Sequence, residues 1–422
     1  MRTRRNSGAD ADRCPAEADP PYRQEGRVID FDALERANAP LNAFTDFDRA
    51  AVGGTGPLAD LTIGIKANIA TKGLPWTGGM ALFRNRIAER DAVVVAQLRQ
   101  AGAAIIGSLN MEEAALGAKT DNPWFGAVQN PHRLNFTAGG SSGGSGAAVA
   151  AGLCDAALGT DTMGSIRIPA AYCGIFGFKP AFDAVSQDGL EMTAPSLDTI
   201  GPMARDLETL ERVARIISRF GEEDGEGPVA TLSDLGHVAC EPAVLTAYGA
   251  AVRAIGARGS VNLPHLPTRI RFAGFIAAAR FLAGHLGQAG PEDISEQLAK
   301  LISYGPKRTA DDLAEDAHVM DETKAALSDA LETYSAIVLP TAPQTAFPHD
   351  QKAPANQADF TCLANIAGLP SISVPAGWSA DGLPVGVQLI GKAGHEAGLF
   401  RLARALDHAL SAYRPPSHFF HR

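Results

Sequence analysis

The stretch NFTAGGSSGGSGAAVAAG, residues 135–152, joins a Gly/Ser run to a tail of small apolar residues. Such a run is found in flexible linkers, in phosphate-binding loops and in the floors of active sites. Flexible linkers are not followed by residues patterned for close packing. Here residues 146–152 predict a tightly packed helix, and the residues after them predict a strand. The stretch is therefore expected inside a folded α/β domain.

The signatures of phosphate-binding loops are missing from this stretch. A P-loop needs GxxxxGK[ST], and residues 135–152 contain no lysine. The dinucleotide fingerprint GxGxxG fails because Val149 stands where the third glycine belongs. Residues 140–144 formally match GxSxG, the nucleophile elbow of serine hydrolases. That elbow follows a strand, however, and HRLNFTAGG, residues 132–140, is a poor strand pattern.

Strand and helix patterns alternate on both sides of the run. Residues 61–69 predict a strand, residues 91–102 a helix with Asp91 near its N-cap and Gly102 past its end, and residues 103–110 a buried strand. This order indicates a partly parallel sheet covered by helices. We expect one large α/β domain over residues 28–422, with a central mixed, mostly parallel twisted sheet flanked by helices.

Two regions depart from this rhythm. Residues 205–335 are rich in helical spacing, and we expect them to form a variable helical region that contributes to a substrate pocket. Residues 1–27 are polar and contain proline, which predicts a disordered N-terminal tail.

Composition narrows the class of protein. The chain has 422 residues, of which 45% are hydrophobic, and a formal net charge of −10. That charge argues against nucleic acid as a partner, because phosphate binding needs basic surface. No apolar run reaches the ~20 residues of a membrane span, and the N-terminus lacks the apolar core of a secretory signal. The five cysteines are scattered without CxxC, which predicts reduced thiols and a cytoplasmic protein.

A second glycine-flanked serine, Ser165, follows a short apolar run 24 residues beyond Ser141. A serine hydroxyl must lose its proton to attack a carbonyl, so a base is required. None of the ten histidines is adjacent to these turns in a recognisable pattern. Lys66 instead stands within an apolar strand end, and burial favours a neutral amine that can act as a base.

These stretches together resemble the amidase signature family of serine hydrolases. The resemblance covers about residues 39–410, nearly the whole domain, and implies the family's fold and its hydrolysis of amides through an acyl-enzyme. Four stretches carry it: GIKANIATKGLP (64–75), AGGSSGGSGAAVAAG (138–152), GTDTMGSIRIPAAYCGIFGFKP (159–180) and PSLDTIGPMARD (195–206).

The resemblance also implies a role for each site residue. Ser165 is the nucleophile, Ser141 relays a proton and follows an unusual cis peptide bond, and Lys66 is the ultimate base. Backbone N–H groups of the nucleophile turn are expected to stabilise the oxyanion, and a further set of residues is expected to support the site. The oxyanion donors are Thr162, Met163, Gly164 and Ser165, and the supporting residues are Ser142, Thr160, Asp161 and Arg167. No cofactor or metal is expected, because HExxH is absent and the histidines lack ligand spacing.

Two positions depart from the family pattern. The family usually has an aspartate after the lysine, where this chain has Ala67. It often has a glycine two residues before the nucleophile, where this chain has Met163. Losing the carboxylate should change how Lys66 is supported and ease its deprotonation. Met163 should crowd the pocket and favour a small acyl group.

The function expected from these residues is hydrolysis of a small carboxamide with release of ammonia or an amine. The partner is then the small-molecule amide, with no nucleic acid and no membrane, and a homodimer is expected from base rates. Three alternatives stay open. One is an amidotransferase subunit that amidates misacylated tRNA within a complex, although the acidic charge does not favour tRNA contact. The others are a non-catalytic binding protein on the same scaffold and a Ser–His–Asp hydrolase that uses Ser142.

Overall fold

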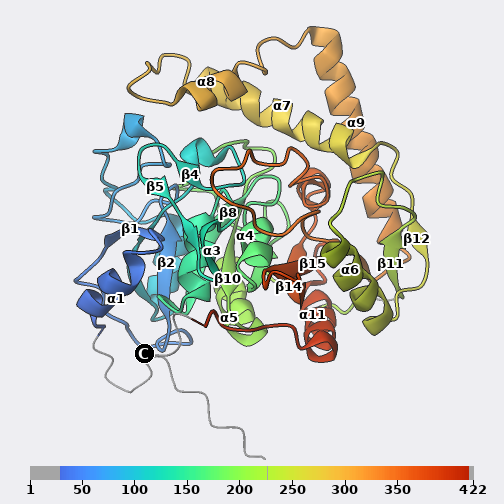
Figure 1. Cartoon of the computed structure of the whole chain (residues 1–422), viewed down its shortest axis with the longest axis horizontal. Coiled ribbons are helices and arrows are strands. Elements are labelled where there is room, and N and C mark those ends of the chain that lie inside the picture. The colour runs from blue at the N-terminus through green and yellow to red at the C-terminus, as the bar shows by residue number, and fades with distance from the viewer. Residues whose placement is uncertain (1–28, 226, 418–422) are drawn as a thin grey trace, which may run out of the picture.

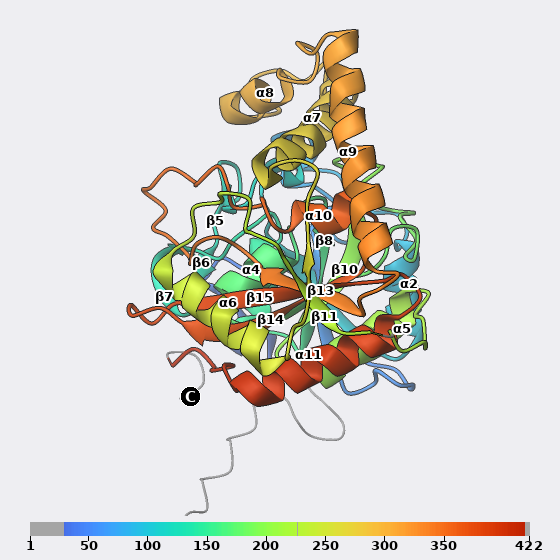
Figure 2. The ribbon, with the colours of Figure 1, turned by 90° about the vertical axis from the view of Figure 1, so that its right-hand side faces the viewer.

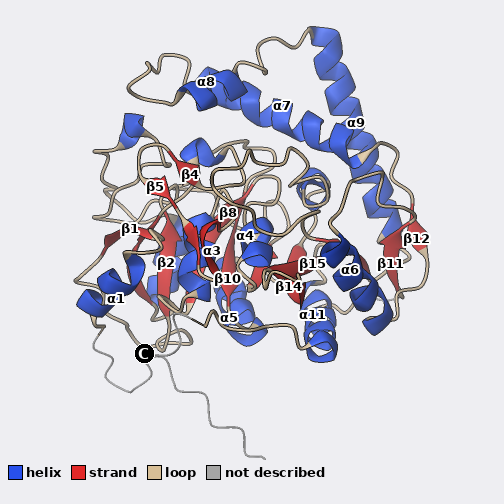
Figure 3. Cartoon of the chain, in the orientation of Figure 1, coloured by secondary structure: helices blue, strands red, loops and turns tan. Residues whose placement is uncertain are grey.

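The structure of the chain is a computed structural model that describes residues 29–225 and 227–417. The predicted disordered tail at residues 1–27 lies outside this described part. A large twisted sheet crosses the molecule, and helices cover both of its faces (Figures 1 and 3). The expectation of a single domain with a mixed sheet flanked by helices is confirmed.

Within the described residues the central sheet has 11 strands, in the order β1-β3-β2-β8-β10-β9-β14-β15-β13-β11-β12. Two small sheets, β4-β5 and β6-β7, stand apart from it. The strands are β1 Phe44–Phe47, β2 Thr62–Lys66, β3 Ala104–Leu109, β4 Asp121–Asn122, β5 Gly126–Ala127, β6 Gln129–Asn130, β7 Arg133–Thr137, β8 Ala156–Asp161, β9 Phe176–Lys179, β10 Thr199–Ala204, β11 Val229–Leu232, β12 Ser260–Val261, β13 Ala336–Pro340, β14 Ser371–Trp378 and β15 Pro384–Gly391.

The expectation that the sheet is mostly parallel is wrong. Pairing is parallel along β3-β2-β8 and along β13-β11-β12. The other neighbours in the central sheet are antiparallel. Two features cause this: β10 returns between β8 and β9, and β14 and β15 form a hairpin. A short connection can join only antiparallel strands, because a parallel pair needs a crossover of a dozen or more residues.

Helices on the two faces of the sheet bury separate cores. Residues of α2, α5, α6 and α11 pack on one face, and α1, α3 and α4 pack on the other (Figure 2). A third core joins α7, α8, α9 and α10 to β11 and β13. The helices are α1 Phe31–Asn38, α2 Val93–Gln100, α3 Gly143–Ala150, α4 Arg167–Tyr172, α5 Leu207–Ile217, α6 Pro242–Ala254, α7 Pro267–His285, α8 Glu296–Ile302, α9 Ala310–Ala330, α10 Cys362–Ile366 and α11 Glu396–Leu410, with 3-10 turns η1 Ala81–Phe83 and η2 Glu113–Ala115.

The region expected to be helical, residues 205–335, contains α5 to α9 together with β11 and β12. Helices α7, α8 and α9 lie together along the top of the molecule in Figure 1, above the ends of the strands. Residues of α7 and α8 line the large cavity described below.

The Gly/Ser run lies in the interior, as its packing pattern predicts. All eight residues of α3 are buried. A Cβ at Gly144 would lie 2.3 Å from the carbonyl oxygen of Asn110 and 2.5 Å from that of Ala43, so only glycine allows this approach. Before the run, the structure forms a strand, β7, where the pattern was poor. Most of β7 is exposed, so it lacks the apolar alternation of a core strand.

The described cysteines, Cys154, Cys173, Cys240 and Cys362, are free thiols, as their scattered positions predict. Across residues 29–225 and 227–417, none of the helices combines the length and the apolar character that crossing a membrane would need.

Candidate active site

Lys66 ends β2 with its side chain fully buried. Its Nζ donates hydrogen bonds to Ser141 Oγ and to Thr160 Oγ1, both at 2.7 Å. Asn68 Nδ2 donates to the same Thr160 oxygen at 3.2 Å. The lysine amine is thus held between two hydroxyl groups, one from the Gly/Ser run and one from β8.

Burial lowers the pKa of Lys66 from 10.5 to about 7, although the carboxyl groups of Asp198, Asp161 and Glu112 act in the opposite direction. A buried ammonium loses its hydration, and hydroxyl partners replace only part of it. An amine with this pKa is neutral in a large share of molecules near pH 7 and can accept a proton.

Ser141 lies in the bend before α3, and its peptide bond with Gly140 is cis. Its side chain is fully buried. The neighbouring Ser142 Oγ donates to the carbonyl oxygen of Thr160 and accepts from its N–H, both at 3.2 Å. Ser142 therefore ties α3 to the end of β8. Both contacts of its hydroxyl are to backbone, which is not the arrangement of a Ser–His–Asp nucleophile.

Ser165 lies in the turn between β8 and α4, and its carbonyl oxygen accepts the N–H of Ser142 at 3.3 Å. The two glycine-flanked serine turns thus lie against each other. Ser165 is 8% exposed and reaches the wall of a cavity of about 940 Å³. The structure brings together the lysine, the Gly/Ser run and the Ser165 turn at the floor of this cavity.

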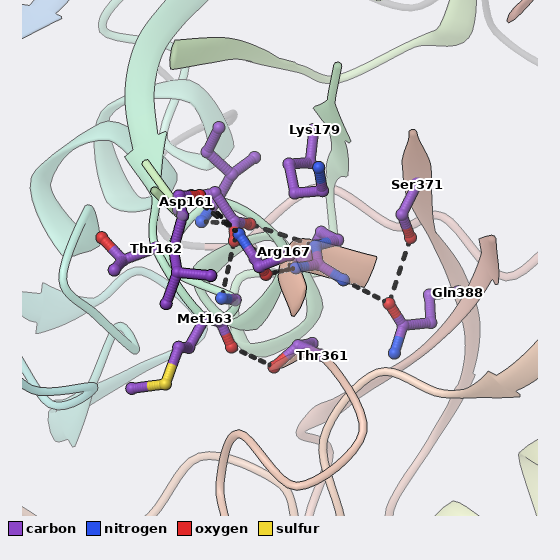
Figure 4. A network of polar contacts seen from close by, with 12 residues as sticks. Asp161, Thr162, Met163, Arg167, Lys179, Thr361, Ser371 and Gln388 are labelled. Carbon is purple, nitrogen blue, oxygen red and sulfur yellow. Dashed lines mark hydrogen bonds and ion pairs between the residues drawn. The ribbon is translucent and has the colours of Figure 1, made fainter. Parts of the chain in front are cut away.

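A buried ion pair holds the Ser165 turn. Asp161, the last residue of β8, accepts from Arg167 Nε and from its guanidinium, both at 3.0 Å, and both side chains are fully buried (Figure 4). Burial alone would raise the pKa of Asp161, but the charge and hydrogen bonds of Arg167 outweigh it and lower that pKa. Arg167 also donates to Gln388 and Asn365, each at 2.7 Å. Both residues therefore brace the turn, as the sequence suggested.

The backbone of the turn differs from the expectation at one position. The N–H of Gly164 donates to Asp161 Oδ1 at 2.6 Å, so it is already engaged. Gly164 has φ +132°, and a Cβ there would lie 2.1 Å from Thr361 Oγ1, which explains the glycine. The expected oxyanion donors therefore reduce to Thr162, Met163 and Ser165.

Side chains that the sequence did not single out hold these donors in place. Thr361 Oγ1 donates to the carbonyl oxygen of Met163 at 2.7 Å. Thr162 Oγ1 donates to Asp198 Oδ1 at 2.6 Å, and burial raises the pKa of the Asp198 carboxyl. Asn365 Nδ2 donates to the carbonyl oxygen of Asp161 at 2.8 Å. Asp198 stands in the quoted stretch 195–206, which is a signal for it, whereas Thr361 and Asn365 lie on or beside α10, far along the chain.

The departure at Ala67 has a packing counterpart. Ala67 is buried in a small apolar cluster with Met111 and Ala115. Ala115 also lines the cavity. Glu112, beside this cluster, is another cavity-lining residue, and burial raises the pKa of its carboxyl even though the N–H of Thr120 bonds to it.

Comparisons with known proteins give a consistent result. The Amidase family model matches residues 32–235 and 229–400. The A chain of glutamyl-tRNA(Gln) amidotransferase from Roseiflexus sp. (strain RS-1) is 35% identical, over 90% of this chain and 89% of the relative. The solved structure of the corresponding amidotransferase chain from Thermotoga maritima has a TM-score of 0.79 and 30% identity, and covers 92% of each chain. A solved amidase has a TM-score of 0.80 and 29% identity, over 90% of this chain and 94% of the other.

Proposed function

We propose that this chain, which belongs to the amidase signature family, is an amidohydrolase that cleaves a carboxamide through an acyl-enzyme on Ser165. The observation that carries the proposal is the contact between a buried lysine amine and Ser141 Oγ at 2.7 Å, next to the turn that holds Ser165. Such an arrangement gives a serine the base that it otherwise lacks.

In the proposed reaction, neutral Lys66 takes the proton of the Ser141 hydroxyl as Ser141 takes that of Ser165. Ser165 Oγ attacks the amide carbonyl, and the negative charge develops on the carbonyl oxygen. Backbone N–H groups of Thr162, Met163 and Ser165 are the proposed donors to it, each worth ~3 kcal/mol of transition-state stabilisation.

The proton then returns through Ser141 to the nitrogen of the leaving group. An amide nitrogen must be protonated to depart, so this return is general acid catalysis by the same relay. Water attacks the acyl-enzyme in the second half of the reaction and releases the acid. Ser142, Thr160, Asp161 and Arg167 keep the two serine turns in register.

The direct test is a panel of carboxamides assayed for released ammonia or amine. The Ser165→Ala variant should lose activity with every amide and should not react with a fluorophosphonate probe that labels the wild-type chain. Ser142→Ala, at the adjacent serine, should retain labelling of Ser165. Undiminished hydrolysis by Ser165→Ala would contradict the proposal, and failure of the wild-type chain to react with the probe would favour a non-catalytic binding protein.

A second candidate is a component of a tRNA amidotransferase, because the relative from Roseiflexus, 35% identical over 90% of this chain, is named as part of glutamyl-tRNA(Gln) amidotransferase. A formal net charge of −10 does not favour direct contact with tRNA. Glutamine hydrolysis that exceeds hydrolysis of other amides would favour this candidate. Light scattering of the purified chain in the same experiment tests the expected homodimer.

A further inference from the structure

The cavity above Ser165 is larger than a simple amide requires. Its volume is about 940 Å³. Cavities of roughly 300–1,000 Å³ bury ligands the size of a drug molecule. If the proposed hydrolysis takes place here, the substrate carries a substantial group besides its amide, and the lining residues indicate its chemistry.

Charge does not dominate the lining. Four cationic and three acidic side chains reach the cavity, so their charges nearly cancel. Lys119 pairs with Asp121 at 2.9 Å, and Arg271 pairs with Asp359 at 2.5 Å. A substrate with a large net charge gains little from such a wall, and a neutral one fits it better.

Aromatic rings form the feature that distinguishes one side of the cavity. Phe272 and Phe275 stand three residues apart on α7, and Tyr304 follows α8. The ring centroids of Phe272 and Phe275 are 6.3 Å apart, and those of Phe275 and Tyr304 are 5.9 Å apart. The three rings form a continuous row, and all three line the cavity.

These rings are not consumed by the core. Tyr304 is 44% exposed, and Phe272 and Phe275 are half-buried. The guanidinium of Arg308 lies 5.5 Å from the Phe272 ring centroid, and Lys307 Nζ lies 5.6 Å from that of Tyr304. Cations cover part of the outer two rings, while the rings still present apolar surface to the cavity.

We propose that Phe272, Phe275 and Tyr304 form a subsite for an aryl group, so that the substrate is a neutral, aryl-bearing carboxamide. This inference rests on the proposed hydrolase function of the same cavity. Aromatic rings pack edge-to-face or offset against one another and gain more from another ring than from an aliphatic group of equal area. The aryl group can belong to the acyl part or to the amine part of the amide, and both sources fit a row of rings.

The experiment compares four amides with the wild-type chain: propionamide, 3-phenylpropionamide, 3-cyclohexylpropionamide and N-phenylpropionamide. Ammonia or aniline release gives kcat and KM for each. We expect kcat/KM for 3-phenylpropionamide or N-phenylpropionamide to exceed that of propionamide by at least about tenfold. The better of the two tells which part of the amide carries the ring. Equal preference for the cyclohexyl compound would overturn the aryl assignment.

Variants locate the subsite. Phe272→Leu and Phe275→Leu keep apolar bulk but remove the ring, and each should lower the ratio of aryl to propionamide kcat/KM by about threefold to tenfold, mainly through KM. Phe281→Leu is the matched control, because Phe281 lies on the same helix, stacks on His285 and does not line the cavity. The proposal is wrong if Phe281→Leu lowers this ratio as much as the other two.

Binding separates failure of the subsite from failure of the hydrolase function. The Ser165→Ala variant should bind 3-phenylpropionamide or N-phenylpropionamide at least about tenfold more tightly than propionamide by calorimetry, whether or not the wild-type chain hydrolyses them. Hydrolysis of all amides without an aryl preference overturns the subsite alone. Absence of hydrolysis and of probe labelling, with aryl binding retained, overturns the hydrolase function alone.

Discussion

At the residue scale, the two groups around the Lys66 amine explain why it can be neutral. Both hydrogen-bond partners of its Nζ are hydroxyls, Ser141 and Thr160, which accept a hydrogen bond without offering a counter-charge. The position after it holds Ala67, so no carboxylate follows the lysine in the chain. Burial therefore outweighs the more distant acids, and the pKa of Lys66 falls to about 7.

This pKa predicts the pH dependence of hydrolysis. The amine must be unprotonated to act as a base, so kcat/KM should rise with pH through about 7 and level off above it. Ala67→Asp places a carboxylate beside the lysine and should raise its pKa, which moves the midpoint to higher pH. Ala67→Asn is the uncharged control and should leave the midpoint near that of the wild type. A profile that is flat between about pH 5 and 9 in wild type would exclude Lys66 as the base.

Met163 has a structural partner that the sequence did not indicate. A Cβ on Gly274 of α7 would lie 3.0 Å from the Met163 sulfur, so the side chain packs into the space that this glycine leaves. Met163 also lines the cavity beside Ser165. Figure 4 shows its side chain pointing away from the Asp161–Arg167 network.

Two substitutions should therefore change acyl-chain selectivity in opposite directions. Met163→Gly should raise kcat/KM for hexanamide relative to acetamide by about tenfold, because it opens space for roughly two methylene groups. Gly274→Ala should lower the same ratio by pushing the thioether toward the cavity. Gly284→Ala, on the same helix, has no atom within 4 Å of its added Cβ and serves as the control. Shifts of the same sign in both test variants would exclude this packing role.

At the element scale, the junction of β8 and α4 is fixed by polar contacts rather than by helix capping. Ile166, the N-cap of α4, has no capping side chain, and α4 has only six residues. The Asp161–Arg167 pair spans the junction, and Asn365 of α10 and Gln388 of β15 complete it. Elements far apart in the sequence thus determine where Ser165 lies.

Breaking this pair should destabilise the protein strongly. Arg167→Met removes the guanidinium and leaves a buried carboxylate unpaired, which costs about 3–5 kcal/mol. Urea unfolding should show a clearly lower midpoint than wild type. Arg90→Met breaks an ion pair with Asp188 whose side chains are 66% and 50% exposed, and its midpoint should stay close to that of wild type. Equal shifts in the two variants would contradict the bracing role of Arg167.

At the scale of the whole molecule, the sheet buries a second lysine that the proposed reaction does not use. Lys179 ends β9 with no exposed surface and donates to the carbonyl oxygen of Pro180 at 2.8 Å. Burial lowers its pKa from 10.5 to about 7, and the charge of Arg167 acts in the same direction. Folding therefore releases a proton from this lysine over a defined pH range.

This proton release predicts how stability depends on pH. Between about pH 7 and 10.5 the unfolded chain keeps the Lys179 proton and the folded chain does not, so the unfolding free energy rises with pH by up to about 1.4 kcal/mol per unit. Below about pH 7 both states are protonated and this slope vanishes. Lys179→Met should remove the slope, so urea unfolding at about pH 7 and pH 9 should show a smaller gain than wild type. An identical gain in both proteins would mean that Lys179 is charged when folded.

Features that depend on local pattern could be predicted from the sequence. Small residues in 135–152 predicted a buried helix, and the apolar neighbours of Lys66 predicted a buried amine, because close packing and burial restrict which residues can stand there. The sequence also indicated the two serine turns and the resemblance that relates them. Strand direction could not be predicted, because it depends on how the chain returns, and β10 inserts between β8 and β9.

Contacts between distant segments became known only from the folded chain. There the Gly164 N–H is engaged by Asp161, Thr361 and Asn365 reach the Ser165 turn, and Met163 packs against Gly274. The aromatic row over the cavity is likewise assembled from α7 and the end of α8. These contacts join residues separated by as many as 204 positions, and no local pattern encodes which segments meet, since the free energy of the whole packed chain selects them.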